Sequence, residues 1–249
     1  METTVKAETP KERLAALGGI VEFHPKDSMF HGHEQQYFSV GESALSCVKH
    51  ALDIAGKKPE DVRQILDYAC GFGRVARWLK AYFPEAEILG VDADTRAVEC
   101  ANDILGINAE RVDLTMKKDM GGPFDLVWMG SLITHLLARD TMDVLAYIHR
   151  HLASDGIFVG TMHGIYVYNR IRNGQKLYGL PQDQVDRLLH DYDMFGYGYG
   201  HYPHVPTYGI SVWNEDMMRR MLGETGFELL DYVEKGWADH QDVFIVRKA

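Results

Sequence analysis

The feature that most constrains the fold is a short apolar strand that runs directly into a glycine-containing turn and a helix. Residues 64–69 have the character of a buried strand, Gly71 and Gly73 follow at once, and residues 75–83 carry apolar side chains at helical spacing. Glycine allows the backbone to approach a ligand because there is no Cβ to clash. The pattern predicts a strand–turn–helix unit that holds a ligand at the end of the strand.

Strand-like and helix-like segments alternate along much of the remaining chain. This spacing is typical of a parallel sheet with helices on both faces. The Ser154–Asp155–Gly156 triplet predicts a turn before the fifth strand, and the last two strands are close enough to pair antiparallel. The expected strands are 64–69, 87–91, 108–114, 124–129, 157–161, 227–233 and 243–247, and the expected helices are 42–56, 75–83, a helix capped by Asp94, 141–152, 182–192 and 214–224.

Four regions follow from this alternation. We expect an N-terminal helical cap segment at 1–60, a cofactor-binding α/β core at 61–162, an inserted lid or substrate cap at 163–213, and a C-terminal part of the core at 214–249. The insertion breaks the rhythm, and long insertions on α/β cores tend to form lids or substrate walls. Its glycines at 196, 198, 200 and 209 indicate a mobile lid.

Charge and cysteine content narrow the function classes. The 249 residues include 26 Lys and Arg against 36 Asp and Glu, for a net charge of −10, with no basic block of the kind that nucleic-acid binders carry. No apolar run approaches a membrane span and the N-terminus lacks the apolar core of a secretion signal. Three widely spaced cysteines favour a reducing, cytoplasmic compartment over a disulfide framework or a zinc site.

Two acidic residues indicate the kind of cofactor. Asp92 ends the second expected strand, 19 residues after Gly73, where a carboxylate can hold both hydroxyls of a ribose. Asp67 lies within the first strand, where a carboxylate would repel a pyrophosphate and attract an ammonium or a sulfonium. The pair therefore favours a cationic amino-acid nucleoside, although Asp67 has the alternative reading of a carboxylate that caps the turn.

These motifs resemble the class I S-adenosylmethionine-dependent methyltransferases. That resemblance implies an α/β, Rossmann-like, seven-stranded, mostly parallel sheet with an antiparallel last strand, helices on both faces and a helical and aromatic cap, with S-adenosyl-L-methionine as the cofactor. It rests on ILDYACGFGR at 65–74, GVD at 90–92, FDLV at 124–127 and LASDG at 152–156. The chain is also similar to a group of bacterial methyltransferase-domain proteins of unsettled substrate, through GSLITHL at 130–136, TMHG at 161–164, YGIS at 208–211 and GWADHQDV at 236–243.

The resemblance implies a role for each cofactor contact. The first-strand turn would line the methionine part, Asp92 would hold the ribose, and residues after the fourth strand would lie under the sulfonium. Tyr37 would close over the methionine carboxylate. The implied set is Tyr37, Asp67, Ala69, Gly71, Gly73, Asp92, Ala93, Asp94, Gly130, Ser131 and His135.

Methyl transfer to a hydroxyl or an amine is helped by a base, and histidine titrates near neutral pH. His135 and His163 follow the fourth and fifth strands, at the edge where parallel sheets bind ligands. If the last strand is antiparallel, His240 at its start faces the same edge. The catalytic candidates are therefore His163, His240 and His135, each with the alternative of a polar loop-end residue. Paired histidines without a third ligand are a weak metal signal, so we expect none.

Aromatic residues of the insertion suggest a wall around the acceptor. Tyr178, Tyr199, Tyr202, Tyr208 and Asp242 are the substrate-binding candidates, although a tyrosine-rich segment can equally pack its own rings together. We expect a small-molecule acceptor, no nucleic acid, no membrane, and a monomer or a homodimer. The alternatives are methylation of a glycan or other macromolecule end, and a non-catalytic cofactor-binding partner subunit. A NAD-dependent oxidoreductase is disfavoured by Asp67.

Overall fold

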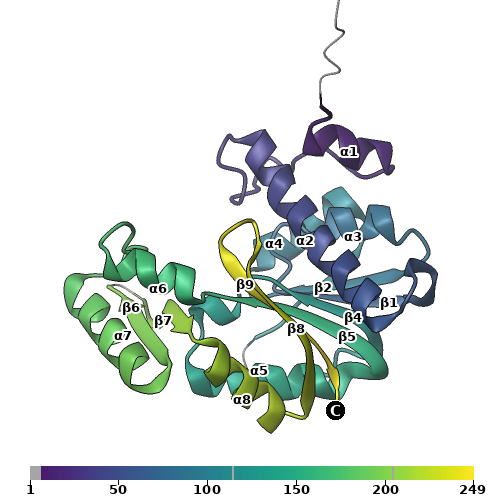
Figure 1. Ribbon diagram of the computed structural model, residues 1–249. Coiled ribbons are helices and arrows are strands. Elements are labelled where there is room, and N and C mark those ends of the chain that lie inside the picture. The colour runs from purple at the N-terminus through teal and green to yellow at the C-terminus, as the bar shows by residue number, and fades with distance from the viewer. Residues whose placement is uncertain (1–6, 114, 204) are drawn as a thin grey trace, which may run out of the picture.

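The structure is a computed structural model that describes residues 7–113, 115–203 and 205–249. A seven-stranded sheet with the order β3-β2-β1-β4-β5-β9-β8 forms its main body (Figure 1). Its strands are β1 (Gln64–Tyr68), β2 (Glu87–Asp92), β3 (Asn108–Arg111), β4 (Phe124–Met129), β5 (Leu152–Met162), β8 (Phe227–Trp237) and β9 (Gln241–Lys248), and a separate pair is made by β6 (Tyr197–Tyr202) and β7 (Val205–Trp213).

The helices cover both faces of the sheet, as the alternation predicts. In Figure 1, α2, α3 and α4 lie on one face and α5 and α8 on the other. The helices are α1 (Pro10–Ala16), α2 (Glu34–Ala55), α3 (Ala76–Tyr82), α4 (Thr95–Leu105), α5 (Ala138–His151), α6 (Ile165–Arg172), α7 (Gln182–Phe195) and α8 (Glu215–Glu224), with short 3₁₀ turns η1 (Pro59–Asp61) and η2 (Ile133–His135).

The two-faced core explains why β4 reads as a nearly continuous apolar run. Leu126 and Trp128 pack with α2 and α3, whereas Val127 and Met129 pack with α5 and α8. A strand covered on both faces has no side that water reaches. The central strands therefore hold the sheet between two apolar layers and leave their ends free to carry polar groups.

The expected sheet is confirmed, including its antiparallel member. Strands β1 to β5 pair parallel to one another, and β9 runs antiparallel between β5 and β8. Thr161 at the end of β5 lies opposite Val243 near the start of β9. Because of this direction, the start of β9 reaches the same edge as the carboxyl ends of the parallel strands.

One local expectation is wrong. No separate turn divides α5 from the fifth strand, because α5 ends at His151 and β5 begins at Leu152. Phe124 pairs with Leu152 and Leu126 with Ile157, so the residues between lie outside the regular register. The Ser-Asp-Gly triplet therefore forms a strand irregularity of the kind that such residues allow.

The insertion forms two helices and a hairpin with their own apolar cluster. Strands β6 and β7 pack against α7, and the glycines are positions of close approach: a Cβ at Gly198 would lie 2.0 Å from the Leu188 carbonyl oxygen, and one at Gly200 2.8 Å from the Leu180 side chain. These glycines therefore have a packing role, and the mobility of the insertion stays a prediction. The cluster comprises Val167, Tyr168, Ile171, Leu180, Val185, Leu188, Tyr192, Ile210 and Val212.

No helix in the described part of the chain has the length and apolarity needed to cross a bilayer.

Candidate active site

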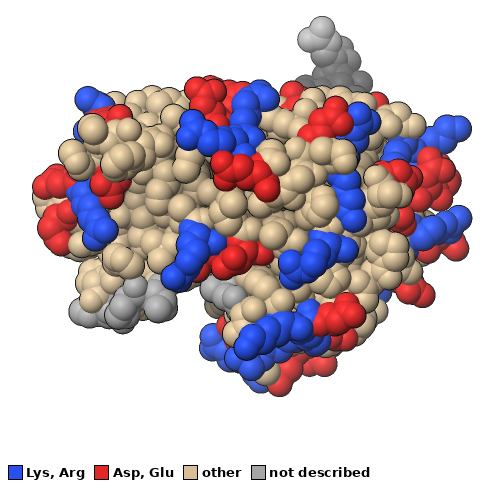
Figure 2. All heavy atoms as spheres, turned by 90° about the horizontal axis from the view of Figure 1, so that it is seen from below, with Lys and Arg blue, Asp and Glu red and all other residues tan. Residues whose placement is uncertain are grey.

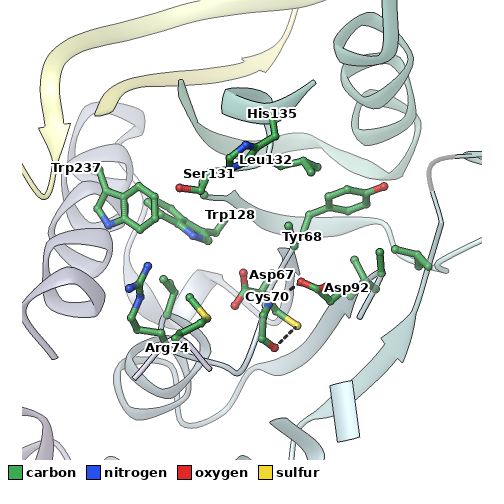
Figure 3. Close-up of a pocket in the computed structure, with 18 of the residues that line it drawn as sticks. Asp67, Tyr68, Cys70, Arg74, Asp92, Trp128, Ser131, Leu132, His135 and Trp237 are labelled. Atoms are coloured by element: carbon green, nitrogen blue, oxygen red, sulfur yellow. Dashed lines mark hydrogen bonds between the residues drawn. The ribbon is translucent and has the colours of Figure 1, made fainter. Parts of the chain in front are cut away.

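A cavity of about 320 Å³ opens at the carboxyl ends of β1, β2 and β4. We call it the strand-end cavity. In Figure 3, Asp67, Arg74 and Asp92 lie on one side of it and Ser131, His135 and Trp237 on the other. Of the residues implied to contact the cofactor, eight line it: Asp67, Ala69, Gly71, Asp92, Ala93, Gly130, Ser131 and His135.

Asp67 brings a buried carboxylate to the cavity. Its side chain is 1% exposed, and Oδ2 has no hydrogen-bond partner among the described residues. Burial, with the nearby charge of Asp92, raises the pKa of Asp67 to about 7. A buried carboxylate without a partner is unfavourable by itself and is stabilised by a cation placed beside it.

The turn after β1 is fixed by the end of β2. The backbone N–H of Gly71 donates to Asp92 Oδ2 at 2.8 Å, and that of Asp94 donates to Asp92 Oδ1 at 2.9 Å. Ala69 and Gly71 both adopt positive φ, of 64° and 53°. Each carboxylate oxygen of Asp92 keeps a second lone pair, so the side chain is held in place and can still accept from two hydroxyls.

Arg74 is the basic group that the sequence analysis missed. It lines the same cavity, its Nε is buried without a hydrogen-bond partner among the residues described, and burial lowers its pKa. The Tyr37 ring lies behind it, with its centroid 6.0 Å from the guanidinium carbon. The signal in the sequence is its place directly after Gly73, in the turn that carries the ligand.

Three implied cofactor contacts lie outside the cavity lining. Tyr37 is 3% exposed and donates its hydroxyl to Asp27 at 2.8 Å, so its ring supports Arg74 from behind. Gly73 faces α4, where a Cβ would lie 2.4 Å from Leu105. Asp94 accepts from the Arg96 N–H at 2.9 Å and caps α4.

Ser131 joins the ends of three strands. Its N–H donates to Thr161 Oγ1 at 2.9 Å, that hydroxyl donates to Gln241 Oε1 at 2.6 Å, and Gln241 Nε2 donates to Ser131 Oγ at 2.6 Å. Ser131 has φ 61°, a conformation that costs free energy for a residue with a side chain. The closed ring of hydrogen bonds holds it there.

Two tryptophans complete this side of the cavity and were also missed. Trp128 and Trp237 pack edge to face at 5.4 Å, and both line the cavity. Trp237 donates from Nε1 to the Val40 carbonyl at 2.9 Å, which ties α2 to the turn between β8 and β9. Trp237 lies in the GWADHQDV motif at 236–243, and this motif is the sequence signal from which its place in the site could have been predicted.

A second cavity, of about 520 Å³, adjoins the first and is lined by all three catalytic candidates. We call it the histidine cavity. His163 and His240 have ring centroids 5.7 Å apart, and Tyr178 Oη lies 3.4 Å from His240 Nε2. Ser131 and His135 line both cavities. The expected convergence of His135, His163 and His240 on one cleft is thus present, and His135 stands at the junction.

Backbone carbonyls set the tautomers of two of these rings. His135 Nδ1 lies 2.7 Å from the Gly209 carbonyl oxygen, and His163 Nδ1 lies 3.2 Å from that of Ser211. A carbonyl only accepts, so Nδ1 carries the proton and Nε2 keeps its lone pair. Burial lowers the pKa of His135, and burial together with His240 and His135 lowers the pKa of His163 to about 3. Both rings are neutral at pH 7.

The substrate-binding candidates divide between the cavities and the packing around them. Tyr178 and Tyr202 line the histidine cavity, and Tyr208 lines the strand-end cavity while stacking on His135 at 4.5 Å. Tyr199 and Asp242 line neither. Tyr199 is buried with its hydroxyl 3.3 Å from the His135 carbonyl, and Asp242 accepts from Tyr232 Oη at 2.5 Å and the Lys235 N–H at 2.8 Å.

Within the described ranges no three His, Cys, Asp or Glu side chains are placed to hold a metal ion together.

Comparison with known families identifies the core. Residues 65–156 match the family model described as a methyltransferase domain. None of the curated proteins matches the chain. The matched segment contains the Asp67 strand, the glycine turn, Asp92 and β4, which are the elements that build the strand-end cavity.

Solved structures share the fold at low identity. The chain is similar to an S-adenosylmethionine-dependent methyltransferase from Clostridium acetobutylicum (13% identity, TM-score 0.59, covering 84% of this chain and 92% of that one). It is also similar to the PH0226 protein of Pyrococcus horikoshii (15%, 0.60, 91% and 96%) and to the sugar N-methyltransferase KedS8 of Streptoalloteichus (14%, 0.61, 100% and 98%).

The family match identifies a methyltransferase domain at residues 65–156, and the fold around that domain is shared with solved methyltransferase structures. S-adenosyl-L-methionine, the cofactor named in the description of the Clostridium acetobutylicum structure, is therefore the molecule to compare with the strand-end cavity. The cavity suits that molecule: among the described residues, one oxygen of the buried Asp67 carboxylate is unpartnered and available to a cationic group, and one guanidinium nitrogen of Arg74 is unpartnered and available to an anionic group. Asp92 offers the acceptors for a ribose.

Proposed function

We propose that the chain methylates an oxygen or nitrogen atom of a small-molecule acceptor held in the histidine cavity, with His135 as the general base. The observation that carries this proposal is the position of His135, which lines both cavities and has its Nδ1 held by the Gly209 carbonyl. His163 and His240, which also line the histidine cavity, then orient the acceptor.

Each charged or hydrogen-bonding group of the cofactor would have its own partner residue in the strand-end cavity. Asp67 would pair with the ammonium group, Arg74 with the carboxylate, and Asp92 with the two ribose hydroxyls. When bound, S-adenosylmethionine supplies a methyl group already activated on a sulfonium. The protein's task is then to align the acceptor and exclude water, and alignment of this kind accounts for much of enzymatic rate enhancement.

His135 would receive the proton that the acceptor loses. Its Nε2 lone pair is available because the proton of the neutral ring resides on Nδ1. Tyr208 stacks on the ring with an interplanar angle of 16° and holds its orientation. A base that is already neutral at pH 7 needs no prior deprotonation, which suits an acceptor hydroxyl or ammonium group.

Several features support a small acceptor. The histidine cavity is walled by the insertion through Tyr178 and Tyr202, and its volume of about 520 Å³ is in the range of small-molecule sites. Basic and acidic side chains are interspersed over the face seen in Figure 2. The solved structures of this fold include a sugar N-methyltransferase, which is compatible with such an acceptor.

We also propose a cytoplasmic location. Its support is that Cys47, Cys70 and Cys100 are free and buried, as is usual in a reducing compartment.

Two measurements test the proposed activity. Calorimetric titration with S-adenosylmethionine should give micromolar binding that Asp92→Ala abolishes. With an acceptor found by screening for S-adenosylhomocysteine formation, His135→Ala should lower kcat by about 10²–10⁴-fold, a much larger effect than its effect on cofactor affinity.

His190→Ala, which changes an exposed histidine on α7, is the matched control and should retain full activity. An unchanged kcat in His135→Ala would show that His135 is not the general base. Cofactor binding without transfer to any acceptor would instead favour a non-catalytic partner subunit.

A further inference from the structure

A third cavity adjoins the histidine cavity. It has a volume of about 600 Å³ and lies between α2, α6 and the turn joining β8 to β9. Lys176 and His240 line both this cavity and the histidine cavity. The three cavities therefore follow one another, with Ser131 and His135 at the first junction and Lys176 and His240 at the second.

Three cations gather around this third cavity, which we call the basic cavity. Arg170 and Lys176 line it, and Lys235 Nζ lies 4.9 Å from the ring centroid of Tyr166, another lining residue. The Arg170 guanidinium carbon is 5.7 Å from the same ring, and Lys176 Nζ is 4.9 Å from the Tyr178 ring. The two tyrosine rings that carry these cations each lie 5.8 Å from the ring of His240.

The cations of this group lack carboxylate partners. In the parts of the chain that the structure describes, Arg170, Lys176 and Lys235 form no ion pair, whereas ten other Lys and Arg side chains do. Asp239 is the one carboxylate that lines the basic cavity. Three cations and one carboxylate around one cavity give it a local excess of positive charge, although the chain as a whole has a net charge of −10.

We propose that the acceptor is an anionic molecule whose phosphate or carboxylate group binds Arg170, Lys176 and Lys235 in the basic cavity while its methyl-accepting atom lies beside His135. This inference rests on the proposed function and specifies its substrate class. Arginine and lysine are the residues that bind such anions most strongly, through charge-assisted hydrogen bonds. The acceptor is elongated, because it extends from the basic cavity through the histidine cavity to His135.

An anion bound in the basic cavity would also act on the His240 ring. Lys176 and Arg170 lower the pKa of His240, after the larger effect of its burial. An anion bound between these cations and the histidine cavity offsets their field at His240. Binding of the correct acceptor thus makes the ring a better hydrogen-bond acceptor for the same molecule.

The test uses the full-length chain saturated with S-adenosylhomocysteine and titrated with inorganic pyrophosphate or citrate. The wild type should bind an anionic probe at one site, and the Arg170→Gln/Lys176→Gln double variant should bind it about tenfold or more weakly. Arg187→Gln removes one positive charge from an exposed, ion-paired position on α7, and should leave binding unchanged. Tighter pyrophosphate binding indicates a phosphate-bearing acceptor, and tighter citrate binding a carboxylate.

Equal probe affinity in the wild type and the double variant would overturn the proposal, as would a wild type that binds neither probe. S-adenosylhomocysteine affinity is measured in every variant and should stay within twofold, which also shows that the variants fold. If the wild type fails to bind S-adenosylhomocysteine, the proposed function itself fails. If it binds this ligand but no anion, only the substrate class is wrong.

A kinetic readout follows once an acceptor is known. The double variant should raise KM for an anionic acceptor about tenfold and change kcat little, because the cations lie away from the reacting atom. For the same acceptor without its anionic group, wild type and variant should have equal KM. A loss confined to kcat would contradict anion binding at this site.

Discussion

At the scale of single residues, Asp67 shows how the site depends on its ligand. Its carboxyl group is buried, one oxygen has no partner, and its pKa is raised to about 7 chiefly by burial. The free protein therefore holds a proton on this group over part of the neutral range. A cationic ligand favours the ionised form, so binding and proton release are linked.

This linkage predicts that S-adenosylmethionine affinity rises with pH. Between about pH 5 and 7 the group must lose its proton before it can pair with the ligand, so affinity should increase up to tenfold per pH unit. Calorimetry in buffers of different ionisation enthalpy should detect protons released on binding below pH 7. Asp67→Asn should bind weakly and without this pH dependence; a persistent dependence in that variant would assign the proton to another group.

His163 makes the stability of the folded chain depend on pH. Its pKa falls from an ordinary 6.5 to about 3 in the folded chain, mainly through burial. Between these values the unfolded chain binds the additional proton, so this contribution is complete above about pH 6.5 and is lost as pH falls, by up to about 1.4 kcal/mol per unit. Urea unfolding at pH 5 and pH 7 should show a smaller pH difference in His163→Asn than in wild type. Equal differences would mean that the folded ring protonates normally.

The sequence predicted some of the site residues and missed others for a physical reason. Asp67 and Asp92 were predicted because their charge and strand-end positions determine what they can bind. Arg74, Trp128 and Trp237 were missed because their roles depend on which way a side chain points after packing. Asp242 was expected in the substrate pocket, but its contacts with Tyr232 and Lys235 become visible only when the β8–β9 hairpin is in place.

At the scale of elements, the insertion shows that glycine can indicate either a flexible segment or a position of close packing. Tyrosine and glycine alternate from Tyr197 to Gly200, and this alternation is the period of a strand. Read as flexibility, the glycines suggested a mobile lid, but in β6 they are the residues that let the strand contact α7. Composition alone does not distinguish these cases, because the partner helix lies elsewhere in the sequence.

Substitution in β6 tests this close approach. Gly198→Ala would place a Cβ 2.0 Å from the Leu188 carbonyl and should destabilise the chain by about 1–3 kcal/mol. Gly223→Ala, in α8, has nothing within 4 Å of its added carbon and should stabilise by about 0.5–1 kcal/mol. Both are measured by urea unfolding. Equal stability of Gly198→Ala and wild type would show that β6 can move away from α7.

At the scale of the whole molecule, the strand-end cavity joins parts that are far apart in the sequence. Met29, from the N-terminal segment, lines it together with the turn after β1 and with Trp237, which also bonds to α2. A ligand in this cavity therefore contacts the N-terminal segment, the core and the β8–β9 turn together. Its binding free energy should appear as stability of the entire fold.

Thermal unfolding measures this coupling. S-adenosylhomocysteine at about 100 times its Kd should stabilise the chain by about 2.7 kcal/mol. For a chain of this length that corresponds to a rise in Tm of about 5–10 °C. The Asp92→Ala variant should show no rise at the same concentration. A shift of equal size in that variant would place the ligand outside the strand-end cavity.

The antiparallel β9 has a consequence for biosynthesis. On the ribosome, the glycine turn, Asp92 and the first five strands emerge early, and β5 then waits with one edge unpaired while the insertion, α8 and β8 are made. His240 and Gln241, which line the histidine cavity, emerge after all of these elements. A nascent chain thus contains the glycine turn and Asp92 well before the residues that complete the histidine cavity have been made. Translation that stops anywhere in the insertion leaves an exposed sheet edge, a recognised site of aggregation and of chaperone capture.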